Sequence, residues 1–266
     1  MHKSLYLAAL FTLGAPTLAC AAERQPLVKL GIEGYREHYE ETVDGSRFME
    51  EKARMYGLTG ALRMEVSEQG ALALEGRFVR GNADYDSDSG SYSGLSRRSH
   101  DLRLVYQHEL TAKGVRFVPE FGVGVRELTD NLQESGPGGY RRESTYRYAT
   151  IGVRSLHELG NGWRLEPKLS YNHLIEGEQV SRLRDVDANF SDLTNKQTKG
   201  YGFELSASFV TEVDAGKAVS ITPFWRGWRI DDSNVQPIRS AGVQVGEGME
   251  PKNETNEIGL SLAYHF

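Results

Sequence analysis

Apolar and polar positions alternate without a break over the final nine residues of the chain. Ile258, Leu260, Leu262, Tyr264 and Phe266 fall on one face, and small or polar residues occupy the positions between them. Successive side chains of a strand point to opposite faces, so this period of two predicts a half-buried strand over 255–266. Aromatic rings favour a membrane–water interface, which suits Tyr264 and Phe266 at the outward rim of a membrane barrel.

The same alternation recurs earlier in the chain. Leu72, Leu74 and Phe78 oppose Glu75 and Arg77, and three later segments behave alike. A globular antiparallel sheet gives this pattern too, so no single strand distinguishes a lipid-facing wall from a soluble one. The number and spacing of the strands therefore decide the fold.

Two classes of connection alternate between these segments. The short, glycine-bearing turns suit tight hairpins and fall at 68–70, 111–114, 160–162 and 214–217. The long polar stretches fall at 43–52, 86–99, 131–143, 184–198 and 231–254. Together they predict ten strands, at about 26–41, 53–67, 71–85, 100–111, 115–129, 143–158, 163–178, 199–213, 218–230 and 255–266.

Short turns at one end and long loops at the other are typical of bacterial outer-membrane barrels. The sequence predicts an all-β fold: one transmembrane, antiparallel, up-and-down β-barrel of about ten strands, with short periplasmic turns and long extracellular loops. A helical membrane protein is excluded, because only 39% of residues are hydrophobic and 26% are charged. No later segment approaches the roughly 20 consecutive apolar residues that a spanning helix needs.

The N-terminal residues have the composition of a cleaved Sec signal peptide. Lys3 supplies an early positive charge, 5–18 is mostly apolar, and Ala19-Cys20-Ala21 supplies small residues. We expect a signal peptide over 1–21 and an outer-membrane barrel over 22–266. Cleavage one residue later and lipidation of Cys20 stay open as alternatives.

Charged residues of both signs occupy the inward positions. The predicted lumen is lined by Lys29, Glu33, Arg63, Glu75, Arg77, Arg103, Arg116, Glu120, Arg126, Arg154, Arg164, Glu166, Lys168, Glu204, Arg226 and Glu257. Eight strands enclose room for side chains only, whereas sixteen leave an aqueous channel, so ten lies near the closed end. An unpaired buried charge costs several kcal/mol, so opposite charges should pair across the lumen. We therefore predict a salt-bridged lumen, with a narrow solute channel as the alternative.

The second long loop has a run of alternating carboxylates. Asp84, Asp86 and Asp88 are weak candidates for a loop-bound divalent cation such as calcium. Gly90 lies one position late for an EF-hand loop, and Leu95 stands where the bidentate glutamate belongs. A solvated acidic loop is the simpler interpretation, and we expect no other cofactor.

Ten strands with extended surface loops resemble the omptin family of surface proteases. That resemblance implies an Asp-x-Asp pair after the third strand, which Asp84-Tyr85-Asp86 matches in type and place, and an Asp/His pair after the seventh. The loop over 184–198 has aspartates but no histidine, and His173 is expected on the lipid face. Without a general base we expect no enzyme, and omptin-like proteolysis is the less favoured alternative.

A second resemblance covers most of the chain. Segments 119–126, 142–146, 162–163, 223–233 and 250–259 look like recurrent blocks of a proteobacterial outer-membrane β-barrel family described as porin-like or autotransporter-barrel-like. The resemblance implies the fold and location of a Gram-negative outer-membrane barrel. Our primary hypothesis for function is a non-enzymatic barrel whose rigid wall displays loops that bind an unknown extracellular ligand or support the envelope.

The expected partners follow from that location. They are outer-membrane lipid, lipopolysaccharide, and the barrel-assembly machinery, for which Tyr264 and Phe266 are the expected sorting signal. A net charge of −6 argues against nucleic acid, which requires a basic stripe.

Overall fold

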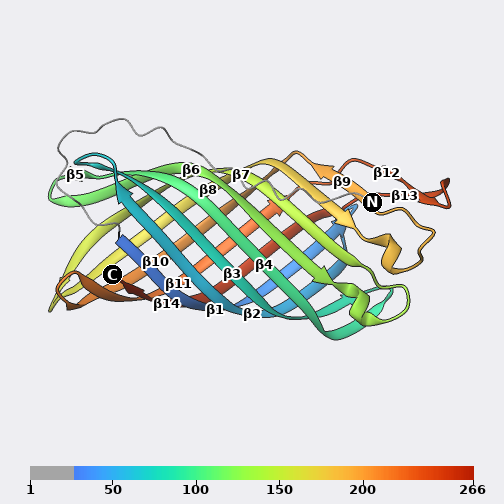
Figure 1. The fold of residues 1–266 in the computed structure, drawn as a ribbon, viewed down its shortest axis with the longest axis horizontal. Helices are drawn as coiled ribbons and strands as arrows, with labels where there is room; N and C mark the ends of the chain where they lie inside the picture. Colours follow the sequence, from blue (N-terminus) through green and yellow to red (C-terminus); the bar gives the residue numbers. More distant parts are fainter. Residues whose placement is uncertain (1–26) are drawn as a thin grey trace.

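The computed structural model describes residues 27–266, which form a closed barrel of antiparallel strands (Figure 1). The ten wall strands are β1 (Leu27–Val43), β2 (Ser46–Glu65), β3 (Gly70–Ser87), β4 (Gly90–His108), β6 (Val115–Asn131), β7 (Arg141–Gly160), β8 (Trp163–Ser181), β10 (Gly200–Asp214), β11 (Lys217–Ile230) and β14 (Lys252–His265). Each strand pairs with its neighbours in chain order, and β14 pairs with β1 to close the ring. The predicted fold class is confirmed.

The terminal strand completes the barrel as its pattern predicts. Leu30 of β1 lies opposite Tyr264, and Glu37 lies opposite Glu257. The rings of Tyr264 and Phe266 meet edge to face, with centroids 4.7 Å apart. Within the described residues, no helix is long and apolar enough to cross a membrane. The expected signal peptide, 1–21, lies outside those residues.

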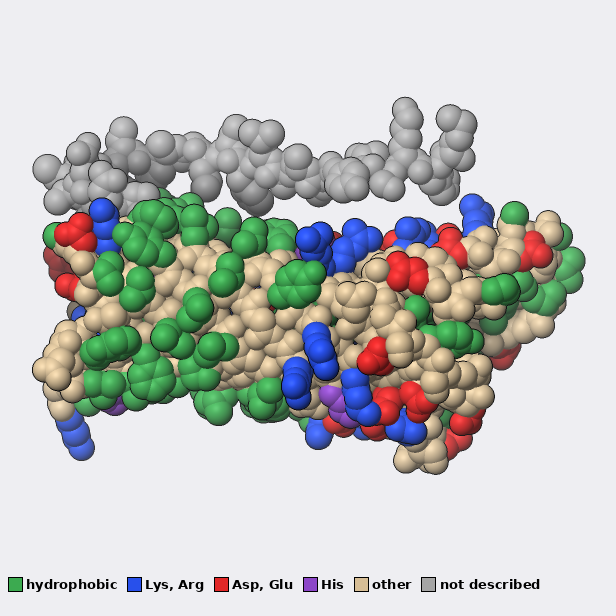
Figure 2. Space-filling model, turned by 90° about the horizontal axis from the view of Figure 1, so that it is seen from below, with side chains coloured by type: hydrophobic (Ala, Val, Ile, Leu, Met, Phe, Trp, Pro, Cys, Tyr) green, Lys and Arg blue, Asp and Glu red, His purple; other side chains and the backbone are tan. Residues whose placement is uncertain are grey.

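An apolar belt surrounds one half of the outer wall. Leu58 is 64% exposed and Ile258 is 62% exposed, although both are large aliphatic side chains. Figure 2 shows such side chains banded at one end of the molecule, with charged side chains gathered toward the other. A continuous exposed apolar surface of this kind requires an apolar solvent, so this half of the wall faces lipid.

Two of the five expected loops are strands instead. The stretches 43–52 and 86–99 continue the walls of the barrel and turn only at their tips. Asp44 and Gly45 have φ of 50° and 78°, as a two-residue hairpin turn requires. The prediction was wrong because outward residues above the belt are polar, so the apolar-outward alternation that marks the strands inside the membrane is lost there.

The remaining long connections lie at the extracellular end. They contain η1 (Leu132–Ser135), η2 (Leu183–Asp185) with β9 (Leu193–Gln197), and the hairpin of β12 (Gln236–Ser240) and β13 (Val243–Gly248). The last two connections contact each other: the Asn195 amide donates to the carbonyl oxygens of Asn234, at 2.7 Å, and Gly248, at 3.2 Å. The short β5 (Leu110–Ala112) lies at the opposite end, which is also the end of the barrel that holds the C-terminus (Figure 1).

Candidate functional site: the charged lumen

One carboxylate near the middle of the lumen binds three arginines. Glu257, on β14, lies 2.9 Å from Arg77 of β3, 2.9 Å from Arg126 of β6 and 2.9 Å from Arg226 of β11. Arg126 is 0% exposed and Glu257 is 1% exposed. Arg226 also reaches Glu33 of β1, at 3.2 Å. These contacts join strands from opposite walls, so side chains cross the lumen at this level.

Aromatic rings complete this level. The Arg226 guanidinium lies 3.9 Å from the ring centroid of Phe224, and that of Arg126 lies 5.7 Å from the ring of Trp228. A ring face stabilises a desolvated cation by up to about 2 kcal/mol. The guanidiniums of Arg126 and Arg226 therefore each contact a carboxylate and an aromatic ring.

A second layer lies above the first, toward the extracellular end. Arg97 contacts Glu37 at 2.5 Å and also forms ion pairs with Glu51 and Asp130. The sequence prediction missed most of this layer. Glu51 and Arg97 fall in the stretches mistaken for loops, and Asp130 lies one residue beyond the strand expected over 115–129.

A third layer closes the extracellular mouth. Arg142 lies 2.6 Å from Glu41 and 3.3 Å from Glu250. The Gln179 amide donates to Glu250 at 2.7 Å, and the Tyr39 hydroxyl donates to Glu41 at 2.8 Å. Glu250 belongs to the connection between β13 and β14, so the longest extracellular connection folds back over the mouth. Burial raises the pKa of the Glu250 carboxyl above its ordinary value.

The three layers fill the upper half of the lumen. Their charged side chains are buried from water, and the tyrosines between them, Tyr146 and Tyr148, are buried too. Paired and mostly buried charges therefore cross the lumen at three levels, at Glu257, Arg97 and Arg142.

Below the layers the lumen widens into a polar cavity of about 260 Å³ toward the end with the short turns. Arg103 bridges Glu75 at 2.7 Å and Glu204 at 3.0 Å across its wall. The other predicted lumen residues that line it or pair at its wall are Lys29, Arg63, Glu120, Arg154, Arg164, Glu166 and Lys168. Arg116 differs: it is half-exposed near the rim and pairs with Glu109 and Glu158.

The acidic stretch of β3 lies on the outer wall. Asp84 accepts from the Gly94 amide at 3.1 Å, and Asp86 accepts from the Ser91 hydroxyl at 2.5 Å and from Arg47 at 3.4 Å. Both carboxylates therefore have protein partners. His173 is exposed on the outer face of β8, as its parity predicts.

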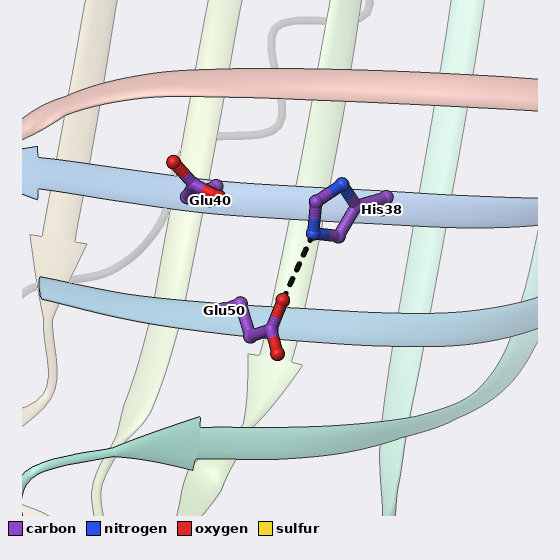
Figure 3. A group of neighbouring side chains, drawn as sticks. All are labelled: His38, Glu40 and Glu50. Atoms are coloured by element: carbon purple, nitrogen blue, oxygen red, sulfur yellow. Dashed lines mark hydrogen bonds and ion pairs between the residues drawn. The ribbon is translucent and has the colours of Figure 1, made fainter. Parts of the chain in front are cut away.

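In the part of the chain that the structure describes, a different trio brings metal-ligating atoms within 4.8 Å: His38, Glu40 and Glu50 (Figure 3). The trio lies on the outer wall, where His38 is 3.0 Å from Glu50. Glu50 also meets Arg47 at 3.0 Å and Lys52 at 2.9 Å. Two cations already offset its charge, so the trio behaves as a surface ion-pair network.

Comparison with solved structures finds outer-membrane β-barrels. The outer membrane protease OmpT from Escherichia coli is 11% identical, with 91% of this chain and 96% of that chain covered and a TM-score of 0.63. OprG from Pseudomonas aeruginosa is 11% identical (91% and 95% covered, TM-score 0.35). Ail, the attachment invasion locus protein of Yersinia pestis, is 8% identical (91% and 97% covered, TM-score 0.31).

No protein-family model and no curated protein matches the chain. At 11% identity, the likeness to OmpT shows a shared barrel fold and nothing about activity. Together with the closed wall and its lipid-facing belt, this fold places the chain in the outer membrane of a Gram-negative bacterium.

Proposed function

We propose that this protein is a non-enzymatic outer-membrane barrel with a closed lumen, which displays its extracellular connections for binding. The observation that carries the proposal is the layer at Glu257, where one carboxylate binds three arginines from across the barrel. Ion pairs of this kind stabilise a closed lumen, because separating them leaves uncompensated buried charges. Wild-type protein is expected to conduct no solute.

The extracellular hairpin β12–β13 is the proposed binding surface. Val243 is 65% exposed and Val245 is 59% exposed, although both lie outside the lipid-facing belt. The hairpin is held in place by the Asn195 hydrogen bonds and by Glu250, which anchors the chain just beyond it. Exposed apolar side chains on a fixed support are typical of surfaces that bind another macromolecule.

A small-solute channel is the rival function. The lower cavity supplies half of a path, but a channel would also need the three layers above it to open. Efflux from liposomes tests this: liposomes that contain the folded protein should release trapped small sugars no faster than liposomes without protein do. A heat-modifiable shift in gel mobility serves as the control for folding. Rapid flux from correctly folded protein would reject the closed lumen.

Omptin-like proteolysis remains a less favoured alternative. Asp84 and Asp86 are bonded to neighbouring groups on the outer wall, and the loop over 184–198 contains no histidine to act as a general base. Cleavage of basic peptides by the wild type, lost in Asp84→Ala and in Asp86→Ala, would establish the protease and overturn the non-enzymatic proposal.

A further inference from the structure

Four arginines on the outer wall have no carboxylate partner among residues 27–266. They are Arg36 of β1, Arg54 of β2, Arg80 of β3 and Arg98 of β4, and all four are exposed. Arg36 lies directly opposite Arg54, and Arg80 lies directly opposite Arg98. Among residues 27–266, no acidic side chain is within ion-pair distance of any of them. Like charges that face each other across adjacent strands destabilise a sheet. An anion bound between these arginines would offset that repulsion.

The four arginines, the arginine patch from here on, differ from every other arginine in the wall strands that the structure describes. All the other wall-strand arginines form ion pairs. Those inside the lumen pair with carboxylates of the three layers or of the cavity wall, and those outside pair with surface carboxylates. Arg147 and Arg229, for example, also point outward but pair with Glu176 at 3.6 Å and Glu254 at 3.1 Å. The patch is therefore a local excess of charge on four adjacent strands.

The patch lies at the edge of the lipid-facing belt. Moving toward the periplasmic end, the next large outward side chains are Ile32, Tyr56 and Phe78 on the first three strands, and His100 followed by Leu102 on β4. Figure 2 shows basic side chains gathered where the apolar band ends. Since the long connections mark the extracellular side, the patch lies at the level of the outer-leaflet headgroups.

Two features of the wall favour a lipid over a free anion. A shallow hollow of about 360 Å³ lies beside Arg80 and Arg98, and Tyr56, Asn82 and Glu134 also line it. The Glu134 carboxylate accepts from the Ser96 backbone amide at 2.8 Å. Below the patch, the outward positions 34, 60 and 76 are glycines, at which an added Cβ would meet no atom closer than 3.4 Å. At positions 60 and 76 the side chains of Leu30 and Leu102 lie against the glycine backbone, so the wall beneath the charges is a low apolar surface on which acyl chains can lie.

We propose that the arginine patch binds the phosphate groups of an outer-leaflet glycolipid, the diphosphorylated glucosamine lipid at the base of lipopolysaccharide. Guanidinium groups bind phosphate through paired N–H donors in a fixed fork, which makes arginine better suited than lysine to this ligand. Pairs of arginines on adjacent strands match a headgroup that carries two phosphates. The acyl chains would lie on the belt below.

The test measures binding of purified diphosphoryl lipid A to the folded full-length protein in detergent, by native mass spectrometry. The double variant Arg54→Ala/Arg80→Ala should bind roughly tenfold to a hundredfold more weakly than the wild type, as expected for the loss of charge-assisted hydrogen bonds. The matched control is Arg147→Ala/Arg229→Ala, which removes two outward arginines that already have carboxylate partners, and it should bind like the wild type.

Two further ligands identify the source of the phosphate. Monophosphoryl lipid A should bind more weakly than the diphosphoryl form, and phosphatidylglycerol should bind weakest and without dependence on the patch. Equal binding of all three lipids, or equal losses in the two double variants, would overturn the proposal. The heat-modifiable gel shift confirms that each variant is folded, so a loss of binding reports on the patch and not on misfolding.

Discussion

Buried charge is tolerated in this barrel because the carboxylates and guanidiniums pair with one another. Glu257 is the clearest case, since it contacts three arginines at 2.9 Å each. Its inward position follows directly from the alternation of the final strand. The sequence did not reveal that Arg77, Arg126 and Arg226 would converge on it, because convergence depends on the tilt and stagger of strands far apart in the chain.

Replacing this carboxylate should be costly. Glu257→Gln keeps the shape of the side chain but leaves the arginine charges short of a partner, and should lower the free energy of unfolding by about 3–5 kcal/mol. Urea titration of the protein in lipid vesicles measures the change. The matched control, Glu254→Gln, removes the exposed partner of Arg229 on the same strand and should cost under about 1 kcal/mol. Equal losses in the two variants would contradict the structural role of the layer.

The anchoring of the longest connection should depend on pH. Burial raises the pKa of Glu250, so the folded state holds its proton more tightly than the unfolded state does. The stability of the anchored connection is therefore fully present below the ordinary glutamate pKa of about 4.3 and declines as pH rises through the folded value. Proteolysis within 231–249 should accelerate over that range in the wild type.

Glu250→Gln should remove this pH dependence, because its side chain is neutral at every pH. Glu247→Gln is the control, since Glu247 is exposed on β13, and this variant should keep the wild-type profile. If proteolysis of the Glu250→Gln variant still depends on pH, the dependence belongs to another group and the prediction for Glu250 is wrong.

At the scale of elements, the number of strands and their order were predictable, and the strand ends were not. Within the belt, outward residues are apolar and inward residues are polar, so the period of two is visible. Above the belt, outward residues such as Glu50 and Lys52 are charged, while inward residues such as Met49 and Ala53 are buried. The alternation of polar and apolar residues then no longer distinguishes a strand of the wall from a loop. The sequence therefore predicted β2 and β4 to be shorter than they are in the structure.

The extension of β2 above the membrane can be tested by cysteine labelling. Lys52→Cys should react quickly with a membrane-impermeant maleimide, and Ala53→Cys should react slowly, because neighbouring residues of a strand point to opposite sides of the wall. Ser89→Cys, in the turn between β3 and β4, is the control for full access. Equal labelling at positions 52 and 53 would indicate a flexible loop and contradict the extended strand.

At the scale of the whole molecule, the barrel divides into functional zones along its axis. The periplasmic half has a lipid-facing belt outside and a polar cavity inside. The extracellular half has a charged wall outside and three charged layers inside, and the β12–β13 hairpin extends beyond it (Figure 1). The proposed headgroup contacts of the arginine patch lie at the boundary between the two halves, where the solvent changes from lipid to water.

Single-channel conductance in planar bilayers shows whether the lumen of the folded barrel is closed. Folded wild-type protein should give no conductance steps, because charged side chains pair across the lumen at Glu257, Arg97 and Arg142. Stable, ion-selective steps from the wild type, altered by Arg126→Ala or Arg226→Ala, would show that ions pass these arginines and that the lumen is open.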